Sequence, residues 1–204
     1  WVVATAITWV LLGIALVLLE QVLEAGTLIY TLGGWPAPWG IEYRIDLASA
    51  FMLVIITGIG SAVMPYARAS VEAEIPEERI YLFYCMYLLN LAGLLGIAIT
   101  GDVFNLFVFL EISSLSSYVM ISLGKDRRAL TAAYRYLIMG TIGATFYIIG
   151  VGLMYMATGS LNMADLATLI PPIADSRTVL MSLAFITVGL GLKLALVPLH
   201  MWLP

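Results

Sequence analysis

Two charged side chains lie inside long apolar segments that carry no other charge. Glu111 is the one charge in residues 103–124, and Lys193 is the one charge in residues 178–204. An ionisable side chain near the centre of a membrane costs about 2.5–3.5 kcal/mol on insertion scales, so it is tolerated only when it is paired or faces water. At the rise of an α-helix, Glu111 lies about 12 Å and Lys193 about 22 Å from the outer end of its segment. We therefore expect an ion pair between Glu111 and Lys193 on neighbouring helices.

Such a pair can hold and release a proton. Burial favours the neutral form of an amine, whereas a nearby carboxylate favours the charged form, so a small change in their separation loads or releases a proton. The alternative is that the pair only holds the helices together. Stability alone is a poor reason to keep a buried ion pair, because packed apolar groups of the same size often serve as well. We therefore predict that Glu111 and Lys193 form a proton relay.

His200 lies close to Lys193, after Pro198 in the same segment. Proline removes a backbone donor and disfavours helix at the residue before it, so we expect the last helix to break at Val197. An imidazole beside exposed backbone could continue the proton path. A histidine at a helix end is as often capped and inert, so both interpretations stay open for His200.

Hydroxyl groups accompany the two charges. Side chains of this kind either carry water into a helix bundle or bond back to carbonyls of their own helix, and the sequence favours neither. They are Ser113, Ser114, Ser116, Ser117, Thr141, Thr145 and Tyr147. A small-residue face made by Gly140, Gly143 and Ala144 permits close packing with another helix.

The composition excludes several classes of protein. Of the 204 residues, 62% are apolar and 11% are charged, and the mean hydropathy is +1.03, so the chain is not a water-soluble globule. Nine Lys and Arg against thirteen Asp and Glu leave a formal charge of −4, which provides no basic surface for nucleic acid. The single cysteine, Cys85, cannot form a disulfide or a cysteine-pair metal site within the chain. We expect no metal or cofactor site here.

The apolar runs predict an all-α, multi-pass membrane domain over residues 1–204. A bilayer core about 30 Å thick needs roughly 20 apolar residues of helix, and about six runs qualify. They are 1–19, 47–67, 80–101, 103–124, 136–164 and 178–204. The fifth is too long for one span, so we expect it to end near Thr158 and Gly159. The first residue is Trp1 and no basic segment precedes the first run, so we expect no signal peptide and a fragment of a longer protein.

Lysine and arginine in the connections predict the orientation. Cytoplasmic loops collect these residues, and loops 68–79 and 125–135 contain most of them, so both loops are expected on the cytoplasmic side. On the outer side, alternating arms around a Gly/Pro-rich tip predict a β-hairpin over residues 28–45. Asn162 is expected to cap a short outer helix, and Asp102 to cap the helix that contains Glu111.

Five stretches match motifs of a known group of membrane subunits. They are Gly33–Trp35, Thr100–Asn105, Val108–Glu111, Gly159–Leu166 and Lys193–Pro204. Together they resemble the antiporter-like subunits shared by Mrp-type multisubunit Na+/H+ antiporters, energy-converting hydrogenases and respiratory complex I, and most of all the D-type subunit of the Mrp group.

The resemblance implies a fold of about fourteen helices with two inverted bundles, each with its own proton half-channel. It implies that Glu111 is the acid of the family's fifth helix, Lys193 the amine of its broken seventh helix, and His200 the histidine of the stretch that follows. Residues 1–204 would then cover most of the first bundle.

The sequence and the resemblance together predict a subunit that moves protons, in exchange for Na+, within a multisubunit complex of the cell inner membrane. Its partners would be other membrane subunits, the lipid bilayer, protons and Na+, and it would carry no redox chemistry of its own. Three alternatives remain open. They are a proton-pumping subunit of a redox-driven complex, a quinone-site protein with an apolar cleft, and a structural scaffold subunit.

Overall fold

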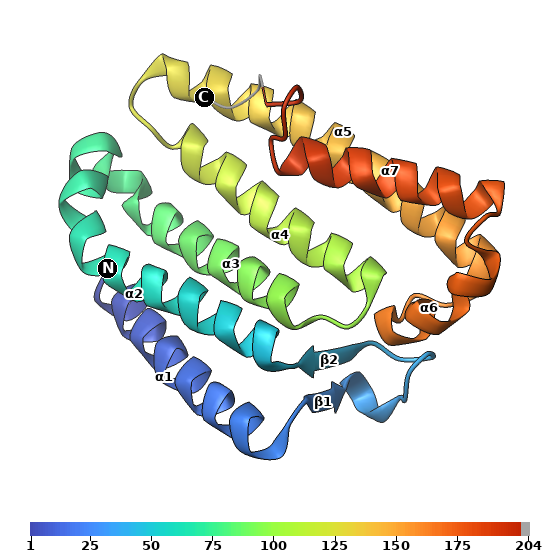
Figure 1. Cartoon of the computed structure of the whole chain (residues 1–204). Coiled ribbons are helices and arrows are strands. Elements are labelled where there is room, and N and C mark those ends of the chain that lie inside the picture. Colours follow the sequence, from blue (N-terminus) through green and yellow to red (C-terminus); the bar gives the residue numbers. More distant parts are fainter. Residues whose placement is uncertain (201–204) are drawn as a thin grey trace.

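The computed structural model describes residues 1–200, which form long helices that lie side by side (Figure 1). Residues 201–204, and with them the end of the predicted run 178–204 and of its motif, lie outside the described residues. The helices are α1 Val2–Ala25, α2 Leu47–Glu74, α3 Ile80–Ile99, α4 Val103–Ser122, α5 Arg127–Thr158, α6 Met163–Leu169 and α7 Arg177–Lys193. The strands are β1 Leu28–Thr31 and β2 Glu42–Ile45, and 3-10 turns occupy Leu32–Gly34, Glu77–Arg79 and Pro171–Ile173.

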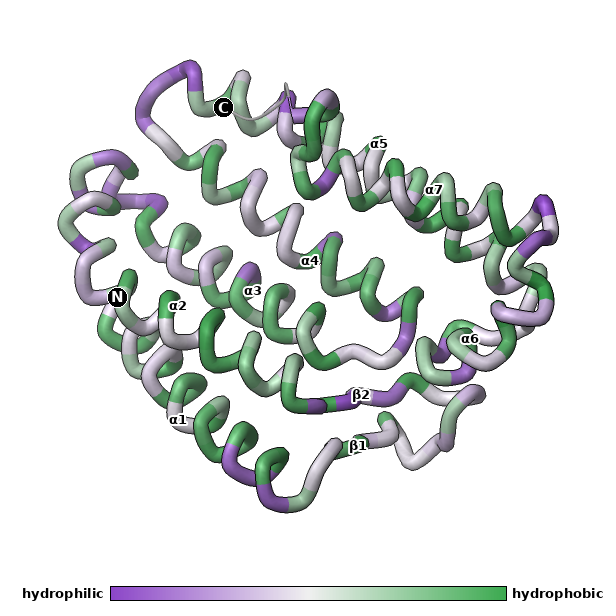
Figure 2. The backbone as a smooth tube through the Cα atoms, in the orientation of Figure 1, coloured by the Kyte–Doolittle hydropathy of each residue, from purple (hydrophilic) through white to green (hydrophobic). Residues whose placement is uncertain are grey.

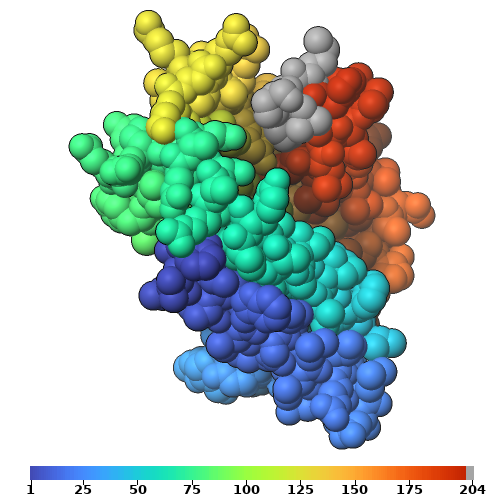
Figure 3. All heavy atoms as spheres, turned by 90° about the vertical axis from the view of Figure 1, so that its left-hand side faces the viewer, coloured from blue at the N-terminus to red at the C-terminus, as the bar shows by residue number. Residues whose placement is uncertain are grey.

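The helices α1 to α4 follow one another in chain order, and α5 and α7 pack together beyond α4 (Figure 1). Figure 3 shows one face of the molecule, with α1 and α2 at one end and α7 at the other. Each of α1 to α5 is long and apolar enough to cross a membrane. This all-helical, multi-pass arrangement confirms the predicted fold class.

The packing is that of an integral membrane protein. Apolar side chains cover the outside of the helices, as Val10 and Ile59 do with 62% and 61% of their surface exposed. The polar residues gather at the helix ends and in the connections (Figure 2). Several of the most buried side chains carry hydroxyl groups instead, namely Thr8, Thr57, Ser61, Ser116 and Ser182. Two of them join helices, because Ser61 donates to the carbonyl of Thr8 and Ser182 to that of Gly150.

Local sequence signals account for most of the helix ends. The Asp102 carboxylate accepts the amide N–H of Asn105 at 2.7 Å, and the Asn162 side-chain oxygen accepts those of Ala164 and Asp165 at 3.0 Å. Both predicted caps are thereby confirmed, and each satisfies amides that have no partner within the first turn of their helix.

The fifth span ends where the sequence predicts. Helix α5 stops at Thr158, and Gly159 follows with φ of 75°, a left-handed conformation that glycine adopts without steric cost. The long run 136–164 is therefore divided between α5 and the short helix α6.

The last helix ends earlier than predicted. Helix α7 stops at Lys193, and Ala195 takes a φ of 51°. The amide of Leu196 then donates to the carbonyl of Gly191 at 2.9 Å, which is the hydrogen bond of a Schellman motif. The expected break at Val197 is thus wrong by about one helical turn, because this left-handed turn closes the helix before Pro198 is reached. With 17 residues, α7 is also shorter than the run that was expected to span the membrane.

The predicted hairpin is present at one end of the bundle. Strands β1 and β2 are antiparallel, with Tyr30 opposite Tyr43 and Leu28 opposite Ile45. The hairpin is joined to the helices because the Glu42 carbonyl accepts the amide of Gly101, just after α3. In Figure 1 the hairpin and α6 lie at one end, and the α2–α3 and α4–α5 connections lie at the other. Lys125 joins the α4–α5 connection to the end of α2 through its ammonium group, which donates to the carbonyl of Ala73 at 2.8 Å.

Helices α5 and α7 approach closely because glycine leaves room between them. A Cβ atom at Gly150 would lie 2.8 Å from the backbone carbonyl oxygen of Ser182 in α7. A Cβ atom at Gly189 would lie 2.6 Å from the amide nitrogen of Tyr147 in α5. Backbone atoms cannot move aside as side chains do, so any larger residue must separate the two helices.

We therefore expect Gly150→Ala to destabilise the protein. The added methyl group overpacks the α5–α7 contact, which costs about 1–3 kcal/mol of unfolding free energy. Gly152→Ala is the matched control, because a Cβ atom there would meet nothing within 4 Å and alanine favours helix by about 0.5–1 kcal/mol. Thermal unfolding in detergent micelles measures both variants. Equal midpoints for the two would contradict the close packing.

The cap at Asp102 makes a second expectation, which depends on pH. Burial raises the pKa of the Asp102 carboxyl, against the opposing effect of its hydrogen bonds with the amides of Asn105 and Phe104. As pH rises above the ordinary aspartate value of 3.8, the unfolded chain ionises before the folded one, so the free energy of unfolding falls.

Asp102→Asn should abolish this fall and keep the cap, because asparagine caps helices as well as aspartate does. Asp102→Ala should instead have an unfolding free energy about 1 kcal/mol below that of Asp102→Asn at every pH. Unfolding midpoints of the three proteins over a pH series test both statements. A pH dependence that Asp102→Asn shares with the unmodified chain would contradict the first.

Candidate functional site

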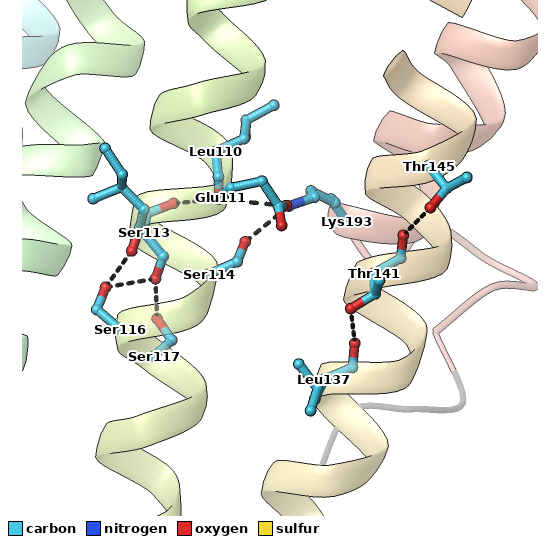
Figure 4. A network of polar contacts seen from close by, with 11 residues as sticks. Leu110, Glu111, Ser113, Ser114, Ser116, Ser117, Leu137, Thr141, Thr145 and Lys193 are labelled. Atoms are coloured by element: carbon cyan, nitrogen blue, oxygen red, sulfur yellow. Dashed lines mark hydrogen bonds and ion pairs between the residues drawn. The ribbon is translucent and has the colours of Figure 1, made fainter. Parts of the chain in front are cut away.

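Glu111 and Lys193 meet between α4 and α7 (Figure 4). The ammonium Nζ of Lys193 lies 2.7 Å from Oε1 of Glu111. The Lys193 side chain is 9% exposed and that of Glu111 is 25% exposed. The predicted ion pair is confirmed, and it lies within the helix bundle.

Ser114 provides a second contact for the ammonium group. Nζ of Lys193 donates to Oγ of Ser114 at 2.9 Å, and the carbonyl of Leu110 lies at 3.5 Å. A lysine ammonium has three donors, and these three oxygens all belong to one stretch of α4. This contact was not predicted from the sequence, where Ser114 was only one of a group of hydroxyl residues. Its spacing of three residues from Glu111 was the available signal, because residues so spaced lie on one face of a helix.

A glycine of α5 lets the end of α7 that carries Lys193 pack closely. Lys193 is the last residue of α7, and Gly143 of α5 lies beside it, where a Cβ atom would be 3.5 Å from Cγ of Lys193. The same Cβ atom would be 3.1 Å from Cβ of Leu192. The small-residue face of α5 therefore lets the end of α7 lie close to α4, which agrees with the packing role predicted for Gly143.

Five of the six other hydroxyl groups bond back to their own helices, whereas Tyr147 of α5 donates to the carbonyl of Val103 in α4 at 3.0 Å. Ser116 donates to the carbonyl of Ile112 at 2.6 Å and Ser117 to that of Ser113 at 2.8 Å. Ser113, Thr141 and Thr145 do the same with the carbonyls of Leu110, Leu137 and Thr141. Figure 4 shows the two threonines bonded along α5, away from the ion pair. Of the two interpretations that the sequence left open, back-bonding holds for these five side chains.

His200 lies in the turn that follows α7, and its side chain is exposed. Within residues 1–200, no hydrogen bond or ion pair joins it to Glu111 or Lys193. The structure thus brings together two of the three predicted site residues and leaves the third at the surface. In the same described part of the chain, no three His, Cys, Asp or Glu side chains are placed to hold a metal ion.

Residues 100–204, which contain the ion pair, match the family described as "NADH:quinone oxidoreductase/Mrp antiporter, TM". The chain belongs to this family. It is 49% identical over its whole length to the N-type subunit of the NADH-quinone oxidoreductase of Desulforudis audaxviator, of which it covers 40%. It is 33% identical over 95% of its length to the D-type subunit of the Na+/H+ antiporter of Alkalihalophilus pseudofirmus, of which it covers 39%.

Two solved structures of respiratory and antiporter assemblies have the same fold. The archaeal membrane-bound sulfane sulfur reductase contains a chain that superposes with a TM-score of 0.90 at 36% identity, over 98% of this chain and 40% of that one. The Mrp complex of Dietzia sp. DQ12-45-1b contains one that superposes with a TM-score of 0.86 at 27% identity, over 98% and 37%. The chain thus spans about two fifths of the length of the curated members of the NADH:quinone oxidoreductase/Mrp antiporter family that it matches.

The pairing makes a prediction about stability in this family member. Glu111→Leu leaves the Lys193 ammonium buried without its counter-ion, which costs about 3–5 kcal/mol in a fully buried site. Because a quarter of the Glu111 side chain is exposed, we expect a loss of about 2 kcal/mol.

The double change Glu111→Leu with Lys193→Met should recover most of this loss, because it removes both charges and keeps apolar volume. Chemical or thermal unfolding of the single and double variants in micelles measures the coupling. If the loss of unfolding free energy in the double variant equals the sum of the losses in the two single variants, the two side chains act independently.

Proposed function

We propose that this chain is the proton-carrying part of an antiporter-like membrane subunit, and that the Glu111–Lys193 pair takes up and releases the proton. The single observation that supports it is the 2.7 Å pair, largely buried within an apolar bundle and joined by Ser114. In a low-dielectric environment, the proton affinity of the amine depends strongly on its distance from the carboxylate.

We propose that residues 1–204 form one transmembrane domain, most of the first of two inverted bundles. The share of about two fifths that the chain covers in its relatives supports this division. We further propose that loops 68–79 and 125–135 face the cytoplasm, which their basic residues favour and their common location at one end permits. His200, on the exposed turn beyond Lys193, is the proposed next proton carrier.

Exchange of protons for Na+ within a multisubunit complex is the first proposed use of this site. The similarity to a relative named as part of a Na+/H+ antiporter supports it. A redox-driven assembly is the second candidate, and the 49% identity to a relative named as part of an NADH-quinone oxidoreductase favours it. Both use the same pair, and both assign other membrane subunits as partners.

The two assemblies are separated by purifying the full-length subunit with its natural partners. Iron–sulfur or flavin proteins in the purified complex would assign a redox-driven machine. Their absence, together with proton flux driven by an imposed Na+ gradient in reconstituted vesicles, would assign an antiporter.

Glu111→Gln and Lys193→Met, each placed in the full-length subunit of the assembled complex, should lower proton-coupled transport by about 100-fold, the scale of a lost acid–base group. Glu111→Gln keeps an oxygen acceptor for Lys193, so assembly should be unchanged. Proton flux in inverted membrane vesicles, followed with a pH-sensitive dye, measures the effect.

Glu20→Gln is the matched control, because Glu20 is exposed at the outer end of α1 and should leave the flux unchanged. A scaffold role makes the opposite prediction for the site. If the double variant Glu111→Gln with Lys193→Met transports normally, the pair serves only to hold the helices.

A further inference from the structure

We propose, on the basis of the function proposed above, that Tyr118 is a proton-transfer residue that links the Glu111–Lys193 pair to the α4–α5 connection. Three observations carry the inference: its register with Ser114 on α4, its ring contact with Tyr136, and the space that Gly140 leaves for its hydroxyl group.

Tyr118 continues the stripe of α4 that already holds the ion pair. Ser114 is three residues and Tyr118 seven residues beyond Glu111, and these intervals return to one face of a helix. At the rise of an α-helix, Tyr118 lies about 10 Å from Glu111 along the axis. Helix α4 ends at Ser122, so Tyr118 stands between the pair and the α4–α5 end of the bundle.

The Tyr118 side chain is buried, with 6% of its surface exposed, and its hydroxyl group points towards Gly140 of α5. A Cβ atom at Gly140 of α5 would collide with that hydroxyl oxygen, so the glycine is what makes room for it. Ser114 precedes Tyr118 by one helical turn on the same face of α4, on the side of the Glu111–Lys193 pair. Ser114 in turn accepts from Lys193, so one hydroxyl stands between the phenol and the amine.

Tyr136 extends the series towards the α4–α5 connection. The rings of Tyr118 and Tyr136 meet edge to face with their centroids 4.6 Å apart. Tyr136 is half-buried and lies in α5 between Gly140 and the start of the helix at Arg127. A groove of about 320 Å³ between α4 and α5 also reaches Tyr118, with Ser122 on its wall. The two tyrosines therefore lead from the buried pair to the end of the bundle where α4 and α5 are connected.

A phenol in this position moves a proton without becoming charged. Its O–H bond breaks as the proton passes to Ser114, which passes its own proton to the neutral amine of Lys193. A new O–H bond forms on the Tyr118 oxygen with a proton that arrives from the α4–α5 end. One proton crosses, both hydroxyl groups are restored, and no other reactant is consumed.

Tyr118→Phe is the variant that tests this path, because phenylalanine keeps the ring contact with Tyr136 and removes only the hydroxyl group. In the full-length subunit of the assembled complex, we expect at least tenfold slower proton flux in vesicles. The loss of proton flux should depend on the pH on one side of the membrane only. The rate should recover as pH falls on the α4–α5 side, because a higher proton concentration compensates for slow delivery, and should not respond to pH on the other side.

Tyr155→Phe is the matched control, since Tyr155 lies on α5 near its other end and is 50% exposed. It should transport like the unmodified complex. A normal flux in Tyr118→Phe, or a loss that is equal at every pH on both sides, would overturn the proposal. The second of these results would mean that the hydroxyl only shapes the packing.

Two further variants keep the outcomes distinct. Should Tyr118→Phe fail to assemble, Ser114→Ala interrupts the same path with the loss of one small hydroxyl, and it must show the same one-sided pH dependence. Glu111→Gln and Lys193→Met are measured in the same vesicles. Normal flux in these two overturns the proposed function itself, whereas their loss of flux beside a normal Tyr118→Phe overturns only the role of Tyr118.

Discussion

The structure depends on how one ammonium group is accommodated away from water. Lys193 has a side chain that is 9% exposed, and an amine so placed must find oxygen partners or lose its charge. Glu111 and Ser114 supply those partners from a single face of α4. The end of α7 must therefore lie against α4, and the neighbouring helices must leave room for that contact.

Glycine and small hydroxyl residues provide the room. The absence of a side chain at Gly143 makes room for Gly189 and Leu192 of α7, and the same absence at Gly150 lets α7 approach the backbone of α5. Ser182 then bonds to the carbonyl of Gly150 across the interface. Packing of this kind does not rely on water to drive the helices together, which is what a bilayer requires, since lipid chains are as apolar as leucine.

Much of this arrangement could be read from the sequence, because a bilayer imposes strong and local rules. A lone charge in an apolar run must be paired, so the pairing of Glu111 with Lys193 could be predicted although the two residues are 82 positions apart in the sequence. Caps at Asp102 and Asn162 followed from side-chain chemistry alone. Side-chain direction was harder to predict, because neighbouring serines point differently: Ser114 reaches Lys193, whereas Ser113 bonds back to Leu110. The end of α7 depends on a left-handed turn at Ala195. Alanine rarely adopts this conformation, so its sequence preference did not predict the turn.

The early end of α7 determines which residue of the Glu111–Lys193 pair can move more easily. The backbone of Glu111 lies in the middle of α4, with helical hydrogen bonds before and after it. Helix α4 also packs tightly on α3, because a Cβ atom at Gly93 of α3 would be 2.7 Å from the amide nitrogen of Ser113. Lys193 is held by helix on one side only, because Leu194 begins the turn. A displacement of that turn changes the distance from Nζ to the carboxylate without breaking α4. Under the proposed function, the proton affinity of the pair is therefore most easily adjusted from the end of α7, next to the exposed turn that contains His200.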